Sequence, residues 1–518
     1  MKTLRDLILT FVAVAMLPLL VFAQEKEVIC RDEACVMEFI KKLDSTNDSV
    51  ALNAQKTLES LADKVRYTGD SDMKNALLGA LIMNIHENPK GKNVDFLMSL
   101  FPKFCGESDI RVVLKLKDQE ALADKAIRTI GDIAGSKTYI EKCIIKGEND
   151  LNYKAAWAYG VGKQIVTRAE DVLISWLKDA DVDTSIEIYK ALVVIRSNEK
   201  TSKIIIKGAK KLYKSKNVEH QIVGMQLYTA VKGDKALPML YKSLKSNGGK
   251  LRREALELMK PFADEKVCKT VLKKCKSGDA LVDAINWLGE MKNNSQMEFL
   301  IKQLSSQNSK IVEATIRAIF KIDDADGINA VKPMFGGRYQ SVIKESMITY
   351  EGDYKAVLND VLKGDDSKKL AVLAIVESRP DVSMYKRVNE MTNAASQEVR
   401  DKAFAMLKLF AVPANADFLS GLLQNCNAKY VTDVQLAIKN SMAKASDEKK
   451  DEFASTLKHV KPNIMPRYYK VFAFFGTELC VNKLIDAYQN GEYNENAKEA
   501  LLLVDNEAFK KKIQEILK

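Results

Sequence analysis

An internal repeat runs through most of this 518-residue sequence. From about residue 120 onward, the chain divides into blocks that each hold two amphipathic helical patterns separated by a short turn rich in Gly, Asp, Asn or Ser. A single helix pair is too small to bury its own apolar face, so it must stack on its neighbours. The sequence therefore predicts an all-α solenoid of about twelve or thirteen stacked antiparallel helix pairs. Successive blocks begin 29 to 36 residues apart, near Asn152, Val182, Val218, Lys250, Asp279, Ser309, Arg338, Ser367, Glu398, Lys429, Asn463 and Asn494.

Two of the predicted first helices share a more specific pattern. Residues 126–133 read Ala-Ile-Arg-Thr-Ile-Gly-Asp-Ile, and residues 284–291 read Ala-Ile-Asn-Trp-Leu-Gly-Glu-Met. A small Ala lets two helices approach closely, and we expect the Gly to permit a left-handed helix end. The second pattern is followed by a polar turn at 292–295 and another apolar stripe, as a helix pair requires.

This pattern resembles the HEAT repeat, especially its short bacterial form of about thirty residues. The resemblance covers roughly residues 118–518 and implies a right-handed, armadillo-like superhelix. We therefore expect three regions: a signal peptide at 1–23, an N-terminal helical or capping region at 24–118, and a HEAT-like repeat array at 119–518.

The first 23 residues have the composition of a secretory signal peptide. Lys2 and Arg5 precede an apolar run that ends at Phe22, and cleavage is expected between Ala23 and Gln24. The apolar run is shorter than the roughly 20 residues that span a bilayer. Nothing later in the sequence is apolar enough for a second span, so we expect an exported protein, periplasmic or extracellular, with no transmembrane span in the mature chain.

Eight cysteines are too few to staple a chain of this length, so burial must supply its stability. Cys268 and Cys275 lie about 10 Å apart along one predicted helix, which is too far for a disulfide, and we interpret them as buried apolar residues. Cys30 and Cys35 flank a predicted helix cap at Asp32. These two cysteines could form a small disulfide-closed loop or remain free, and the sequence leaves both alternatives open.

Positive charge is concentrated in one window. Residues 200–277 hold 18 Lys and 2 Arg against 6 acidic residues, a local balance of +14 in a chain whose total is +11. Two rows of lysines follow predicted helix faces there. In both blocks the row falls on the second helix, which by resemblance lines the concave surface, where it would attract an acidic partner. The candidate binding residues are Lys203, Lys207, Lys210 and Lys214 in one block and Lys266, Lys269, Lys273 and Lys276 in the other.

Catalytic and metal-binding motifs are scarce. The chain has three histidines, one His-Glu step at His86, and none of the common nucleophile or zinc-hydrolase motifs. The acidic run at 323–327 is predicted to be an inter-helix turn and not a calcium loop. Residues 160–163 lack most of a phosphate-loop pattern and are predicted to be a repeat turn. We predict no catalytic residues, no metal and no cofactor.

The sequence favours a non-catalytic exported scaffold that binds a protein or another large partner through the concave face. The partner is expected to be a protein with an acidic surface, and an anionic glycan is the other ligand considered. Nucleic acid is not expected, since the basic window is nearly all Lys and the chain is exported. The alternative is an accessory of a carbohydrate-active enzyme system resembling 3-keto-glycoside hydrolases. That alternative requires exposed aromatic residues, whereas Trp157, Trp176 and Trp287 are predicted to lie in the core.

Overall fold

The structure is a computed structural model that describes residues 28–147, 152–246, 249–410 and 412–518. Every regular element in these ranges is a helix, either α or 3-10, and they contain no strand. The predicted all-α class is therefore confirmed. The chain divides into two units, Met1–Met239 and Leu240–Lys518.

Each unit is a row of helix pairs, and the first helices of neighbouring pairs pack against one another. In unit 1 the first-helix layer holds α3 (Asp48–Thr68), α5 (Val94–Phe104), α7 (Glu120–Asp132), α9 (Lys154–Gln164), α11 (Val182–Ile195) and α13 (Val218–Lys232). The other helices of this unit are α2 (Glu33–Lys42), α4 (Ser71–Glu87), α6 (Ile110–Leu114), α8 (Lys137–Ile145), α10 (Glu170–Trp176) and α12 (Glu199–Tyr213). The short α14 (Leu237–Ser243) crosses the boundary between the units.

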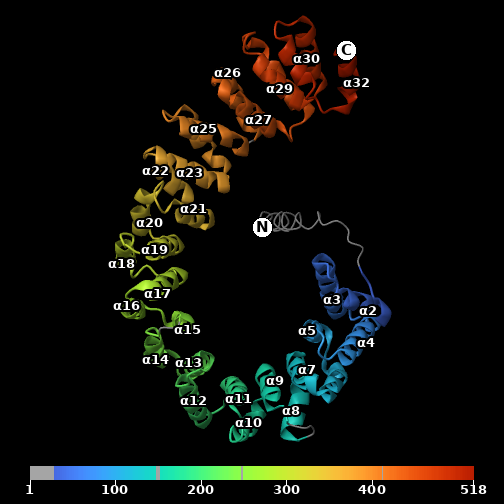
Figure 1. The fold of residues 1–518 in the computed structure, drawn as a ribbon, viewed down its shortest axis with the longest axis vertical. Helices are drawn as coiled ribbons and strands as arrows, with labels where there is room; N and C mark the ends of the chain where they lie inside the picture. Colours follow the sequence, from blue (N-terminus) through green and yellow to red (C-terminus); the bar gives the residue numbers. More distant parts are fainter. Residues whose placement is uncertain (1–27, 148–151, 247–248, 411) are drawn as a thin grey trace, which may run out of the picture. The chain divides into compact units, whose positions relative to one another are not determined.

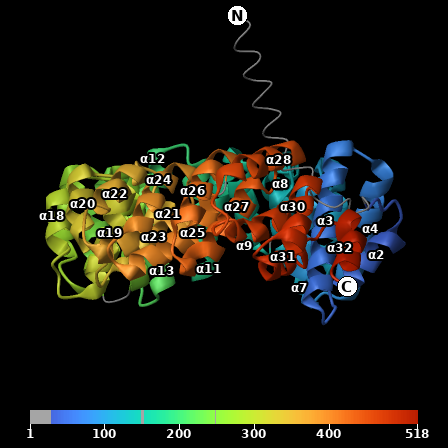
Figure 2. The ribbon, with the colours of Figure 1, turned by 90° about the horizontal axis from the view of Figure 1, so that it is seen from above.

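Unit 2 continues the same plan, with second-layer helices that follow one another in chain order (Figure 2). Its first-helix layer holds α15 (Gly249–Met259), α17 (Gly278–Glu290), α19 (Ser309–Ile322), α21 (Gln340–Thr349), α23 (Asp366–Ser378), α25 (Gln397–Met406), α27 (Val431–Met442), α29 (Pro466–Phe475) and α31 (Asn494–Leu501). The second layer holds α16 (Glu265–Lys274), α18 (Met297–Gln303), α20 (Ala325–Val331), α22 (Tyr354–Val361), α24 (Tyr385–Glu390), α26 (Ala416–Asn425), α28 (Asp447–Thr456), α30 (Glu478–Asn490) and α32 (Glu507–Ile516).

The first helices begin where the repeat predicts. From α9 to α31, each helix or its leading 3-10 turn starts within three residues of a predicted block start. Short polar side chains set many of these starts. Asp181 caps α11 by accepting a hydrogen bond from the Thr184 N–H, and Asn308 caps α19 by accepting one from the Lys310 N–H. Such side chains satisfy N–H groups that have no partner within the helix.

The glycines of the repeat pattern have a different role from the predicted one. Neither Gly131 nor Gly289 has a left-handed backbone. A Cβ on Gly131 would lie 2.8 Å from the Cα of Gly160, and a Cβ on Gly289 would lie 2.8 Å from the Cα of Ala318. These glycines therefore allow neighbouring first helices to touch backbone to backbone. The prediction of a turn at residues 160–163 was also wrong, because Gly160 lies inside α9 and makes this close contact.

This close packing explains which layer lies on the inside of each unit. Figure 1 shows the first helices on the inner side of the curve within unit 2 and the second helices on the outer side, and unit 1 has the same arrangement. A layer of closely spaced helices is shorter than a layer of widely spaced ones, so the row bends toward it. The prediction that second helices line the concave side was therefore wrong.

The core is a run of buried aliphatic side chains with the tryptophans among them. Trp157, Trp176 and Trp287 are at most 7% exposed, as predicted. The six cysteines from Cys105 to Cys480 are all buried. Burial raises the pKa of the Cys268 and Cys275 thiols to about 11, so both are protonated near neutral pH.

At the N-terminal end, Cys30 and Cys35 form a disulfide with their Cα atoms 5.5 Å apart, which settles the alternative left open. Asp32 caps α2 by accepting a hydrogen bond of 2.9 Å from the Cys35 N–H, as predicted. The predicted signal peptide and its cleavage point lie outside the described residues. Within them, no helix is both long enough and apolar enough to cross a membrane.

Candidate functional site

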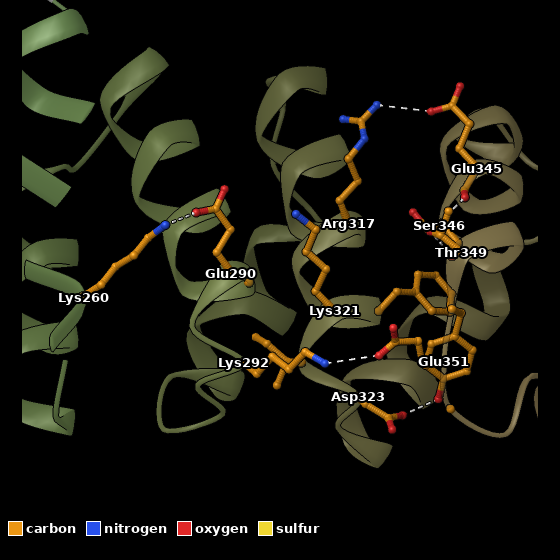
Figure 3. A pocket seen from close by; sticks show the side chains of 15 residues that line it. Lys260, Glu290, Lys292, Arg317, Lys321, Asp323, Glu345, Ser346, Thr349 and Glu351 are labelled. Atoms are coloured by element: carbon orange, nitrogen blue, oxygen red, sulfur yellow. Dashed lines mark hydrogen bonds and ion pairs between the residues drawn. The ribbon is translucent and has the colours of Figure 1, made fainter. Parts of the chain in front are cut away.

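A hollow of about 870 Å³ opens in unit 2 where successive first helices end (Figure 3). We call it the carboxyl-end pocket. Its walls come from four consecutive repeats, because α15, α17, α19 and α21 each contribute their last turn or the residues that follow it. The lining residues are Lys260, Gly289, Glu290, Lys292, Arg317, Phe320, Lys321, Ile322, Asp323, Glu345, Ser346, Thr349, Tyr350, Glu351 and Gly352.

Helix ends explain the residues found here. The last turn of a helix leaves carbonyl groups unpaired and carries negative partial charge, which favours nearby cations. Lys321 lies in the last turn of α19, and Lys292 follows the end of α17. Asp323 ends α19 in the left-handed conformation, with φ of 61°, and Asp324 then caps α20. The predicted turn at 323–327 is therefore confirmed only for Asp323 and Asp324, because residues 325–327 form the first turn of α20.

Ion pairs join different repeats across the pocket: two link neighbouring repeats, and Lys292–Glu351 spans the repeat between α17 and α21. Lys260 Nζ lies 2.7 Å from Glu290 Oε2, and Lys292 Nζ lies 3.4 Å from Glu351 Oε2. Arg317 Nη2 lies 3.6 Å from Glu345 Oε2. Hydrogen bonds to Glu257 and Glu290 raise the pKa of the Lys260 ammonium group. Four cations and four carboxylates line the pocket, so its charge is balanced.

An aromatic pair forms the apolar part of the lining. The rings of Phe320 and Tyr350 meet edge to face with their centroids 5.4 Å apart, and both residues are at most 5% exposed. The Tyr350 hydroxyl donates a hydrogen bond to Asp323 Oδ1. Burial, together with this carboxylate, raises the pKa of Tyr350, so its hydroxyl stays protonated and remains a donor.

Lys321 differs from the other cations of the pocket. Figure 3 shows its side chain between Glu290 and Arg317 without an ion pair. Among the described residues, no carboxylate lies within ion-pair distance of its ammonium group. Within the described residues the pocket therefore offers one cation without an ion pair and several exposed ion pairs, which suits binding of a polar segment with an acidic side chain. The described residues also contain no group of three or more His, Cys, Asp or Glu that could hold a metal ion.

The first row of predicted binding lysines lies on the outer helix layer of unit 1. Lys203, Lys207, Lys210 and Lys214, the α12 lysines, are all exposed. Lys203 pairs with Glu199 at 3.1 Å, and the Lys210 ammonium lies 5.8 Å from the Tyr228 ring centroid. Their predicted exposure is confirmed, whereas their predicted place on the concave side was wrong.

The second row lies on the outer layer of unit 2, so the two rows are separate candidate surfaces. Its residues, Lys266, Lys269 and Lys273 on α16 and Lys276 just after the end of α16, are also exposed. The structure divides them further: Lys273 and Lys276 line a second hollow of unit 2, and the other two do not. Whether any of these lysines contacts a partner stays a prediction.

Sequence reasoning missed the carboxyl-end pocket. The sequence does contain a signal for this pocket. Three consecutive repeats carry a charged residue one or two positions after the end of the first helix, at Lys292, Asp323 and Glu351. Its lining comes from residues that lie up to 92 positions apart, from Lys260 to Gly352, so no local motif marks it. The sugar-binding alternative is not favoured, since all three tryptophans are buried.

Comparison with known proteins gives only remote structural neighbours. No protein-family model matches the sequence, and no curated protein matches it. Among solved structures it is similar to Kap95p bound to RanGDP, at 11% identity and a TM-score of 0.42, with 94% of this chain and 79% of that chain covered. It is also similar to the Kap95:Nup1 complex, at 10% identity and a TM-score of 0.41, with 94% of this chain and 79% of that chain covered. A third similar structure is the S. pombe condensin Cnd3-Cnd2 subcomplex, at 13% identity and a TM-score of 0.24, with 91% of this chain and 70% of that chain covered.

These likenesses are too remote to say anything of this chain's partner. The fold itself follows from the stacked helix pairs and from the close contacts between first helices described above. The chain is a HEAT-like α-solenoid.

Proposed function

We propose that this protein is an exported, non-catalytic scaffold that binds a segment of a protein partner at the carboxyl-end pocket. One observation carries the proposal: residues from four successive repeats converge on one open hollow on the inner helix layer. A solenoid has no single central core, so its extended inner face is available for a long partner.

The chemistry of the pocket favours a polypeptide segment. Its exposed ion pairs contribute little to stability, so a partner can exchange them for its own charges at small cost. Among the described residues, the Lys321 ammonium has no ion pair, so it can bind an acidic side chain of the partner. An acidic side chain is the partner feature that this lining fits best.

Export is a separate part of the proposal. It is supported by the signal-like composition of residues 1–23 and by the Cys30–Cys35 disulfide. Disulfides form and persist mainly in oxidising compartments outside the cytoplasm. Fractionation of the source cells, with N-terminal sequencing of the purified chain, tests this part. A mature N-terminus at Gln24 in an exported fraction is expected, and an intact Met1 in the cytoplasm would contradict it.

The binding proposal is tested by site-specific photocrosslinking. A benzophenone side chain at position 321 places the crosslinker inside the pocket, and one at Lys302, exposed on the outer face of α18, is the matched control. Envelope extract is irradiated with each purified chain, and the crosslinked proteins are identified by mass spectrometry. We expect one protein to crosslink at position 321 and not at 302.

The captured protein is then purified, and its affinity for the chain is measured by calorimetry. Lys321→Glu reverses the unpaired charge and is expected to weaken binding by about tenfold. Lys302→Glu changes charge equally on the outer face and should leave the affinity within about twofold. Equal crosslinking at both positions, or equal affinities for the two variants, would show that the pocket is not the binding site.

A further inference from the structure

A second hollow of unit 2, of about 1000 Å³, lies at the opposite ends of the same first helices. We call it the amino-end pocket. Its lining includes the starts of α15, α17 and α19 and the end of α16. Six exposed cations surround it: Lys245, Arg253, Lys273, Lys274, Lys276 and Lys310.

Its charge is far from balanced. Arg252 also lines the pocket, so seven cations face two carboxylates, those of Asp279 and Asp283. Asp283 is engaged by the buried Arg252 guanidinium, with Oδ2 2.6 Å from Nη2 and 2.7 Å from Nε. Asp279 lies 4.0 Å from the Lys310 ammonium. In the described part of the chain, the ammonium groups of Lys245, Lys273, Lys274 and Lys276 have no ion pair.

The helix ends add to this positive potential. The first turn of a helix carries positive partial charge and favours acidic residues. Here α15 and α19 have no acidic residue in the first turn, and Lys310 occupies that turn of α19. At α17 the N-cap residue Ser277 makes no side-chain hydrogen bond to the helix, and Ser277 and Ala280 line the pocket. Cations beside the positive ends of α15 and α19 lower the stability of the chain. Such an unfavourable arrangement is expected where an anion binds.

We infer that the amino-end pocket binds a compact multivalent oxyanion, meaning two or more phosphate or sulfate groups on one small molecule. Several separated ammonium groups match several charges better than one. Lysine acts as a point charge toward such groups, and the N–H groups at the start of α17 can donate to one of them. The lining contains no aromatic residue on which a base or a sugar ring could stack, so recognition rests on charge.

The experiment is calorimetric titration of the purified full chain with inorganic tripolyphosphate, a heparin disaccharide, orthophosphate and a hexa-aspartate peptide. We expect tripolyphosphate or the disaccharide to bind at least about tenfold more tightly than orthophosphate. The tighter of the two identifies phosphate or sulfate as the natural group. Binding should weaken as salt concentration rises, because counterions compete for the lysines.

Variants locate the binding. Lys273→Glu with Lys276→Glu should weaken binding by at least about tenfold. Lys207→Glu with Lys214→Glu makes the same charge change on exposed α12 lysines outside the pocket and should change it by less than about twofold. Lys273→Gln with Lys276→Gln removes charge without reversing it and should give an intermediate loss. Circular dichroism spectra of all three variants should match the parent spectrum, since the replaced side chains are exposed.

The inference is overturned by any of three results: no binding of either multivalent anion, equal losses in the two Glu variants, or tighter binding of hexa-aspartate. None of these bears on the carboxyl-end pocket, whose test uses Lys321 and a protein partner. The two proposals can therefore fail independently.

Discussion

The two pockets of unit 2 lie at opposite ends of the same helices, α15, α17 and α19. Charges are balanced in one pocket, whereas positive charges are in large excess in the other. The carboxyl-end pocket has four cations and four carboxylates, with three ion pairs between different repeats. The amino-end pocket has seven cations and two carboxylates, and four of its lysines have no ion pair with any residue that the structure describes. The same helix–helix packing supports both.

This difference shows that the two edges of a solenoid can vary separately. In the first-helix layer, α17 and α19 meet backbone to backbone where Gly289 faces Ala318. Gly289 lies in the last turn of α17 and also lines the carboxyl-end pocket, whereas the charged residues at the two helix ends lie outside this contact and are free to change. Charge balance at one end favours an ordered, specific contact, whereas excess charge at the other favours long-range attraction that salt weakens.

The largest expected effect lies at the amino end, in the buried pair Arg252–Asp283. Their side chains are 8% and 14% exposed. Asp283→Ala leaves the Arg252 guanidinium buried without its carboxylate, which should lower the free energy of unfolding by about 3 kcal/mol. Urea denaturation followed by circular dichroism measures the change.

The control is the equivalent replacement at the carboxyl end. Glu351→Ala removes the partner of Lys292, but these side chains are 87% and 65% exposed. The change should therefore stay below about 1 kcal/mol. Similar losses in the two variants would mean that the two pockets do not differ in how their ion pairs are buried.

The next effect tests the contact between α17 and α19, the helices that both pockets share. Gly289→Ala places a Cβ 2.8 Å from the Cα of Ala318 and should separate α17 from α19, at a cost of about 1–3 kcal/mol. Gly421→Ala in α26 is the control, because a Cβ there meets no atom within 4 Å. It should be neutral or stabilising, since Ala favours helix more than Gly does. Thermal unfolding compares the two, and equal melting temperatures would refute the backbone contact.

The sequence predicts the repeat but not the two pockets. Apolar spacing and polar turns mark the helix starts, because each depends on residues close together in the chain. Which helix layer lies on the inner side of the curve depends on contacts between repeats, such as that of Gly131 with Gly160. The sequence analysis assigned Gly131 to a left-handed helix end and so did not predict this contact. The lysine count identified Lys273 and Lys276 as candidates. It did not find Arg253 and Lys310, which reach the same hollow from other helices.

The third effect concerns the lysines without ion pairs in the amino-end pocket. Unlike the first two replacements, this one should raise the free energy of unfolding. Lys273→Gln with Lys276→Gln relieves repulsion between like charges and should stabilise the chain by a few tenths of a kcal/mol at about 20 mM salt. Scanning calorimetry at about 20 mM and 500 mM salt measures it. The gain should vanish at the higher concentration, where screening already weakens the repulsion. Destabilisation at low salt would show that these lysines are compensated by groups of the protein itself.

The smallest effect is the alkaline titration of Lys260 at the carboxyl end. Its ammonium lies 2.7 Å from Glu257 Oε2 and 2.7 Å from Glu290 Oε2, and these bonds raise its pKa. A raised lysine pKa means that the folded chain holds the proton more tightly than the unfolded chain. The resulting stability is fully present below the unfolded value of about 10.4 and is lost as pH rises through the folded value. Glu290→Gln removes one of the two carboxylates, so part of this loss should disappear.

The melting temperatures of the parent and Glu290→Gln should therefore differ at about pH 9 and converge by about pH 12. The remaining lysines, the tyrosines and the cysteines are the same in the parent and the variant. Their contributions to the pH dependence of stability therefore cancel when the two melting temperatures are subtracted. Lys260 is 32% exposed and Glu290 43%, so the difference at pH 9 should be below 1 kcal/mol, about the size of a surface pair. A difference that grows with pH would mean that Glu290 stabilises the neutral amine. The carboxyl end would then not be held by paired charges, and its contrast with the amino end would be lost.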